Sequence, residues 1–422
     1  MWLRFVLYAC LLPPIGVGLG LGKRPHAATA MTVGVAACAA AFLWPRARRA
    51  VAAYYARSRA LRLVDTALWN LSVVLLIGEA TLAVASQLSN HPLLASPNAG
   101  TQSIIENKRR ELLEFYSADG VNSRGYNDTE WSPEPGDAFR IVALGDSFAF
   151  GVVGYARNFL TLLETELSAR VGRPVEVANL GIPGMQPQEY LQILLDDGLV
   201  LHPDLVLLCL YTGNDFQPPD STSRFDARNW RMVGFASRIV RYAAESEFRR
   251  STAAAKGAPT MGGSAPPFTE DNFLRIVEAY IPFLRREPTP RAERGLRATL
   301  AVADEIVARA RPAPVAIALL PSEVQVSPRL RAQVLERVQV AETDLDLDHP
   351  ARETRSHFEP KHVLVIDLLP ALRAAERDAP TYALRNTHWN ERGNATAARQ
   401  IAESLAPMVR DLALARADSA QN

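Results

Sequence analysis

The chain has little cysteine and almost no net charge. Only three of its 422 residues are cysteines, and 46 lysines and arginines nearly balance 45 aspartates and glutamates. Cys10 and Cys38 lie in apolar runs and Cys209 lies in a predicted strand, so the sequence predicts no disulfide framework. A net charge of +1 gives no reason to expect a nucleic acid as a partner.

Metal-binding and nucleotide-binding motifs are also absent. The sequence has no zinc-finger spacing and no P-loop. The run DLDLD at 344–348 suggests calcium, but its sixth position is His349 instead of glycine and its twelfth is Arg355 instead of glutamate. We therefore expect neither a metal nor another cofactor. Six of the seven histidines follow no ligand spacing and are expected to be surface or packing residues: His26, His91, His202, His349, His357 and His362.

Long apolar runs, by contrast, are concentrated in the first 90 residues. A membrane-spanning helix needs about 20 mostly apolar residues. The first two runs meet this requirement, whereas Glu79 near the centre of the third is costly in lipid and must face another helix or lie near the interface. The three runs are residues 2–22, 27–44 and 63–88, the last interrupted by Asp65, Asn70 and Glu79. We predict a membrane anchor of about three helices over residues 1–90.

The charge between the second and third runs sets the expected orientation. Loops rich in arginine stay in the cytoplasm. The N-terminus is then inside, and everything after residue 90 is outside. A cleaved signal peptide for the first run and an amphipathic hairpin on the inner face are the alternatives. The arginines in question are Arg46, Arg48, Arg49, Arg57, Arg59 and Arg62.

A connector over 91–138, rich in proline, asparagine, glycine and serine, leads to a domain at 139–422. In that domain short strands, apolar on both faces, alternate with amphipathic helices, which is typical of a parallel sheet covered by helices on both faces. An insertion at about 216–292 interrupts the alternation. We expect strands at 139–144, 175–179, 205–211, 315–320 and 363–367, and helices at 158–171, 187–199, 293–311, 326–341 and 393–412.

Small and polar residues follow three of these strands and precede the last helix. Ligands of an open parallel sheet bind beyond the carboxyl ends of its strands. The sequence therefore predicts that Ser147, Gly181, Asn214 and His388 meet at one edge. They stand in the segments GDSF (145–148), NLGIPG (179–184), TGND (212–215) and THWNERG (387–393).

These residue types suit acyl transfer. The Ser147 hydroxyl can attack an ester carbonyl, and His388 can take its proton and return it to the leaving alcohol. The tetrahedral intermediate needs preorganised donors, which the backbone N–H groups of Ser147 and Gly181 and the side-chain amide of Asn214 can supply. For Ser147 alone a turn position is the simpler interpretation, and Asn214 can also cap a helix. Asp146 is interpreted as a turn or structural carboxylate.

The four segments, in this order, closely resemble the SGNH or GDSL hydrolase superfamily over roughly residues 120–412. VNSRGYN at 121–127 resembles the lead-in of its membrane-attached bacterial members. The resemblance implies a flavodoxin-like three-layer α/β fold, preceded here by transmembrane helices, and metal-free ester hydrolysis or acyl transfer. It implies Ser147 as nucleophile, Gly181 and Asn214 as oxyanion donors and His388 as base.

The sequence departs from the family pattern beside the histidine. Members usually carry an aspartate two or three residues before it, where this chain has Asn386 and Arg385. An asparagine can hydrogen-bond the ring but brings no charge and can select the wrong tautomer; in serine proteases such a change costs about 10⁴ in kcat. Asp367 or a backbone carbonyl could serve instead of Asn386.

The sequence thus predicts a membrane-anchored serine esterase with its domain outside the cytoplasmic membrane. The expected substrate is an acyl ester of a cell-envelope glycan or lipid, because the anchor holds the domain near the envelope. One alternative is an O-acyltransferase that works with a membrane acyl-donor protein, since THWN resembles the corresponding segment of proteins that acetylate exported polysaccharides. The other is a non-catalytic binding module with the same fold.

Overall fold

The computed structural model describes residues 49, 53, 55–88, 101–116, 121–132, 134, 136–217 and 266–421. The chain divides into two compact units. One contains residues 1–100 and 220–256, and the other contains 101–219 and 257–422. The first two apolar runs of the sequence lie outside the described residues.

In the first unit, the described part is mainly the helix α4 (Arg59–Leu88). Its segment Arg62–Ala85 is long and apolar enough to cross a membrane. Large apolar side chains are exposed along it, among them Leu63, Val74 and Ile77. An apolar helix surface of this kind is stable in lipid and unfavourable in water.

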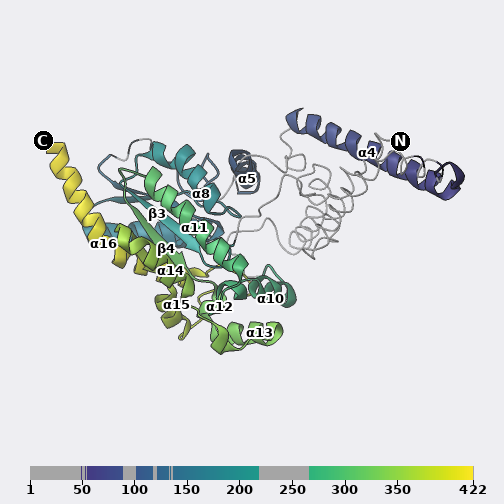
Figure 1. Cartoon of the computed structure of the whole chain (residues 1–422). Coiled ribbons are helices and arrows are strands. Elements are labelled where there is room, and N and C mark those ends of the chain that lie inside the picture. The colour runs from purple at the N-terminus through teal and green to yellow at the C-terminus, as the bar shows by residue number, and fades with distance from the viewer. Residues whose placement is uncertain are drawn as a thin grey trace. The chain divides into compact units, whose positions relative to one another are not determined.

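The second unit is built on a five-stranded sheet with the order β2-β1-β3-β4-β5, in which all neighbouring strands are parallel. Strands β3 and β4 are labelled in Figure 1. This order is that of flavodoxin-like folds and confirms the expected fold class. All five predicted strands are present, and only the last begins one residue later than expected. They are β1 (Phe139–Leu144), β2 (Val175–Asn179), β3 (Leu205–Tyr211), β4 (Val315–Leu320) and β5 (Leu364–Asp367).

Alternate residues of each strand point into two separate apolar cores. In β1, Phe139 and Ile141 join one core, whereas Val142 and Leu144 join the other. The first core is covered by α7 (Phe159–Val171), α10 (Glu270–Glu278), α13 (Pro328–Val338), α15 (Leu369–Glu376) and α16 (Glu391–Gln421). The second is covered by α5 (Thr101–Tyr116), α8 (Pro187–Ile193), α11 (Pro290–Arg309) and α14 (His349–Phe358). Burial on both faces explains why the strands are continuous apolar runs.

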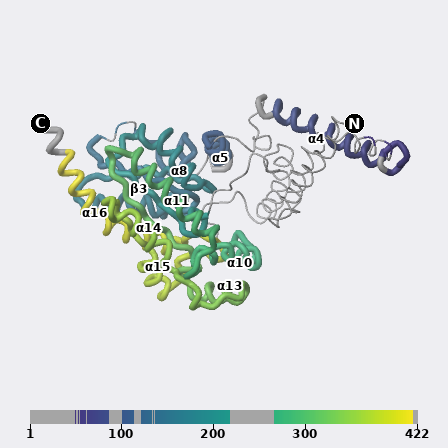
Figure 2. Tube along the Cα trace, in the orientation of Figure 1, coloured from purple at the N-terminus to yellow at the C-terminus, as the bar shows by residue number. Residues whose placement is uncertain are grey.

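The described parts of the expected connector and insertion contribute to this unit. Ile105 and Leu112 of α5 are buried in the second core. From the insertion, Phe273 and Val277 of α10 are buried in the first core. Helix α10 lies beside α13, as both views show (Figure 1, Figure 2).

Candidate active site

Ser147 is held at the start of a one-turn helix directly beyond β1. The helix, α6 (Ser147–Phe150), is capped by Asp146, whose carboxylate accepts the Phe148 N–H at 2.8 Å. The turn requires glycine at 145, because a Cβ there would lie 2.8 Å from the Cβ of Ala149. Phe148 and Ala149 are buried, so the packing of the helix fixes the position of the serine at its end.

His388 lies on a loop that is closed by a β-bridge between Tyr382 and Trp389. The Trp389 ring is buried and packs edge-on against Phe148 at 5.1 Å and Phe159 at 5.6 Å, so its role is to hold this loop on the domain. The loop brings His388 Nε2 to 2.7 Å from Ser147 Oγ. This is the distance of a strong hydrogen bond between a hydroxyl and an imidazole.

Asn386 determines the tautomer of the His388 ring. Its Oδ1 lies 2.7 Å from His388 Nδ1 and also accepts the His388 backbone N–H at 3.2 Å. A backbone N–H is always a donor, so the Asn386 atom that faces both nitrogens must be the oxygen. The proton of the neutral ring therefore lies on Nδ1, and the Nε2 lone pair faces the Ser147 hydroxyl. The wrong tautomer, which the sequence left open, is disfavoured.

No carboxylate hydrogen-bonds the His388 ring in the described part of the chain. Burial lowers the pKa of His388 to about 4, because a charged imidazole loses its hydration there. Asp367, the alternative acid, instead accepts hydrogen bonds from Arg355 Nη2 at 2.6 Å and the Leu369 N–H at 3.0 Å. Asn386 thus occupies the place beside the ring that the sequence assigned to the missing acid.

The segment after β2 brings Gly181 close to α6 (Ser147–Phe150), the serine helix. A Cβ at 181 would lie 2.5 Å from the Phe150 nitrogen and 2.6 Å from the Ala149 Cβ, so only glycine fits. The Gly181 N–H donates to Asn179 Oδ1 at 2.9 Å. To bind an oxyanion, this N–H must be shared with Asn179 or released from it.

Asn214, after β3, faces the capping residue of the serine helix. Its Nδ2 donates to Asp146 Oδ2 at 3.0 Å, which leaves the second N–H of the amide for another acceptor, and its Oδ1 is buried without a partner. Burial raises the pKa of Asp146 to about 6. The neighbouring Asp215 is a structural carboxylate that accepts the Tyr190 hydroxyl at 2.9 Å and the Tyr211 N–H at 2.8 Å.

Residues 121–131, expected to be part of the connector, also contact the site. Asn127 Nδ2 donates to the Phe150 carbonyl at 2.5 Å, and Asp128 accepts the Asn179 N–H at 2.8 Å. These bonds tie the segment to the serine helix and to the Gly181 loop. Only the short motif VNSRGYN pointed to this segment, and nothing in it indicated which residues it contacts.

The family model of the GDSL-like lipase/acylhydrolase family matches residues 143–396, a range that begins in β1 and includes Ser147, Gly181, Asn214 and His388. The chain belongs to this family. The GDSL-like match assigns it to the ester hydrolases.

Solved structures similar to this GDSL-like protein include a lipase/acylhydrolase from Enterococcus faecalis. The two share 14% identity, and the alignment covers 64% of this chain and 96% of the other with a TM-score of 0.35. A catalytic mutant of an acetylxylan esterase from Geobacillus stearothermophilus has 14% identity, with 63% and 93% of the chains covered and a TM-score of 0.34. No curated protein matches the sequence.

Proposed function

We propose that this protein is a membrane-anchored serine esterase in which Ser147 is the nucleophile and His388 the general base. The observation that carries the proposal is the 2.7 Å hydrogen bond between Ser147 Oγ and His388 Nε2, with Asn386 Oδ1 on the far nitrogen of the ring. A nucleophile bonded to a base, and a base held by a third group, is the arrangement that activates a serine.

In the first half of the reaction, Ser147 Oγ attacks the acyl carbonyl as His388 Nε2 takes its proton. The negative charge on the carbonyl oxygen is stabilised by the Ser147 N–H, the free N–H of the Asn214 amide and the Gly181 N–H. The protonated His388 then gives its proton to the leaving alcohol, and an acyl-serine remains. Water, activated by the same histidine, releases the acid and restores the serine.

Asn386 changes the energy of the imidazolium that forms in this mechanism. Its oxygen orients the ring correctly but carries no negative charge to stabilise the imidazolium that forms during attack. The absence of that charge raises the barrier of each proton transfer relative to a serine-histidine-aspartate triad. We therefore expect a slow hydrolase.

We infer an acyl ester of a cell-envelope glycan or lipid as the substrate class. The apolar helix α4 supports attachment to the membrane, and the arginines before it support a domain outside the cytoplasm. An anchored domain meets envelope components at high local concentration.

The test is a panel of acyl esters offered to the full-length protein in detergent, with Ser147→Ala as control. The panel combines short and long acyl chains with sugar and lipid alcohols, and free acid is measured with and without an added sugar acceptor. Serine-dependent release of acid supports the esterase. Transfer of the acyl group to the acceptor with little free acid supports the acyltransferase instead, and no serine-dependent product from any ester refutes both.

A further inference from the structure

The Asp128 carboxylate accepts four hydrogen bonds. Its Oδ2 accepts the Asn179 N–H at 2.8 Å and the Trp131 Nε1–H at 2.8 Å. Its Oδ1 accepts the Thr129 N–H at 2.7 Å and the Tyr155 hydroxyl at 3.3 Å. Three of these four donors are N–H groups that cannot act as acceptors, so the site is built for an acceptor-only carboxylate.

The hydrogen bond to Asn179 connects Asp128 to the candidate active site. Asn179 ends β2, and its own side chain is buried and fully used. Its Nδ2 donates to the carbonyls of Asn127 at 3.2 Å and Ala149 at 2.8 Å, and its Oδ1 accepts the Gly181 N–H at 2.9 Å. The backbone of Asn179 is thus fixed by Asp128, while its side chain fixes Gly181 against the serine helix.

We propose that Asp128 is a positioning residue for the loop of residues 179–184: through Asn179 it sets the place of the Gly181 N–H, and so controls how well that N–H is shared between Asn179 Oδ1 and the developing oxyanion. The inference rests on the proposed esterase function. Asp128 touches neither Ser147 nor His388, so its effect on either must pass through Asn179, which also bonds the Ala149 carbonyl of α6. An oxyanion donor displaced by a fraction of an ångström loses much of its effect, because its hydrogen bond depends steeply on geometry.

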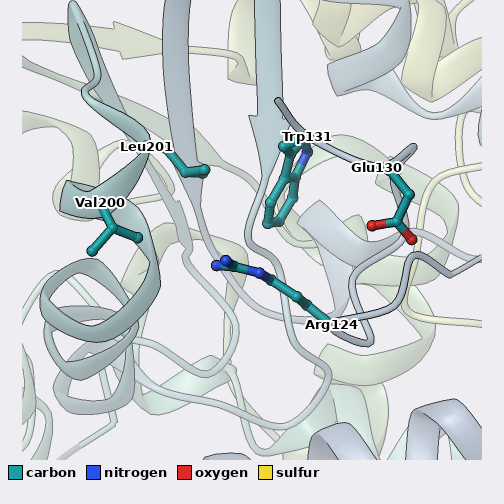
Figure 3. A pocket seen from close by; sticks show the side chains of 5 residues that line it. All are labelled: Arg124, Glu130, Trp131, Val200 and Leu201. Atoms are coloured by element: carbon teal, nitrogen blue, oxygen red, sulfur yellow. The ribbon is translucent and has the colours of Figure 1, made fainter. Parts of the chain in front are cut away.

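Trp131 connects this network to the surface of the unit. Its indole nitrogen faces Asp128, and the side chain lines a cavity of about 250 Å³ together with Arg124, Glu130, Val200 and Leu201 (Figure 3). None of the proposed catalytic residues lines this cavity. Trp131 is therefore the outer member of the network, and replacing it removes one of the two donors on Asp128 Oδ2 without touching the active site.

Steady-state kinetics on the full-length protein test the proposal, with Asp128→Asn, Asp128→Ala and Trp131→Phe as variants. Asn has one acceptor oxygen where Asp has two, so in either orientation its amide group faces an N–H donor. Removing an oxyanion donor outright costs about 10² to 10³ in kcat, and a misplaced donor should cost about 10-fold to 100-fold. We expect that loss in kcat for Asp128→Ala, smaller losses for Asp128→Asn, whose oxygen can still accept from Asn179, and for Trp131→Phe, and KM within about threefold throughout.

Glu130→Gln is the matched control. Glu130 lies in the same segment but accepts the backbone N–H and hydroxyl of Ser123 instead of facing Asn179. It should keep kcat within about twofold. Titrating active sites with a fluorophosphonate expresses kcat per competent molecule, so that partial misfolding of a variant does not imitate the effect. Unchanged kcat in the Asp128 variants, or an equal loss in Glu130→Gln, overturns the proposal.

Amide hydrogen exchange provides a readout that needs no activity. We expect faster exchange of the Asn179 and Gly181 amides in Asp128→Ala, which removes the acceptor of the Asn179 N–H, than in the parent, and no change in Glu130→Gln. If the parent hydrolyses no ester, the esterase proposal fails while exchange still decides whether Asp128 holds this loop, and unchanged exchange refutes the inference. If the parent is active and the Asp128 variants match it, only the inference fails.

Discussion

Asn386 Oδ1 lies 2.7 Å from His388 Nδ1 and accepts the backbone N–H of the same histidine. The Asn386 oxygen therefore orients the His388 ring as an aspartate would, but it carries no negative charge to stabilise the imidazolium. This separation makes the two contributions measurable in a single protein.

Restoring the charge should accelerate the reaction. In Asn386→Asp the carboxylate keeps an acceptor toward Nδ1 and stabilises the imidazolium, so we expect kcat to rise by about 10-fold or more. Asp367→Asn is the control, because Asp367 is bonded to Arg355 and not to His388, and it should leave kcat within about twofold. A large loss in Asp367→Asn with an intact fold would instead identify Asp367 as the functional acid.

The same substitution should move the pH profile. Burial holds the pKa of His388 at about 4, so the neutral base is present well below pH 6 and kcat/KM should fall on the acid side only near pH 4. A neighbouring carboxylate favours the charged imidazolium and raises the pKa. The acid limb of Asn386→Asp should therefore lie at higher pH than that of the parent, as measured with an ester of pH-independent stability. Coincident limbs would contradict the assignment of His388 as base.

Ser147 should be the residue that reacts with an active-site fluorophosphonate. Its hydroxyl donates to the Nε2 lone pair of His388 at 2.7 Å, so its proton leaves as the phosphorus is attacked. We expect peptide mapping to find the adduct on Ser147, and Ser147→Ala to abolish labelling. Equal labelling of the two proteins would place the nucleophile elsewhere.

Asn214→Ala should lower kcat by about 10² to 10³ with little change in KM, because the amide contributes to the oxyanion only in the transition state. The measurement is steady-state kinetics together with the melting temperature. A loss limited to stability would leave Asn214 with the capping role that the sequence also allowed.

Asp146→Asn should separate stability from activity. Burial raises the pKa of Asp146 from its ordinary value of 3.8 to about 6, so the folded state binds this proton more tightly than the unfolded state does. The ionised carboxylate then opposes folding, and stability falls as the pH rises from about 4 to about 6, by on the order of 3 kcal/mol. An asparagine at 146 has no charge to bury, so this pH-dependent loss of stability disappears. Its oxygen can still accept the Phe148 N–H.

We therefore expect Asp146→Asn to gain stability relative to the parent at pH 8 but not at pH 4, as followed by calorimetric melting at both values. Its kcat should nevertheless fall, because an asparagine amide facing Asn214 favours rotation of the Asn214 side chain and withdrawal of its free N–H. If the stability difference between variant and parent is the same at pH 8 and pH 4, the ionised Asp146 carboxylate does not destabilise the folded state.

Much of this arrangement could be predicted from the sequence, because strands buried on both faces are apolar runs that polar turns interrupt. Ser147 and His388 were placed at one edge by the same reasoning. Other features depend on contacts that no local pattern encodes. The predicted helix 187–199 is α8 followed by a π-helical turn over Leu194–Gly198. Helix α14 was not predicted, because most of its residues are polar or charged.

The hydrogen bond between Asp128 and Asn179 could not be predicted from the sequence either. The two residues are far apart in the chain, and Asp128 lies on a segment with the composition of a loop. The tautomer of His388 could also be assigned only from the three-dimensional structure. The sequence identified Asn386 as the neighbour of the ring, but only the shared contact with a backbone N–H shows which end of the amide faces the imidazole.

Ser147 and His388 are 241 positions apart, and the helix that follows His388 helps to bring them together. Asn394, in the first turn of α16, accepts the N–H of Phe159 at the start of α7 at 3.0 Å, and α16 packs along α7. Because synthesis delivers the chain from its N-terminus, Ser147 is made long before His388, its proposed base. On the proposed mechanism, a partly synthesised domain holds Ser147 without its base, and the serine becomes reactive only when α16 packs on α7.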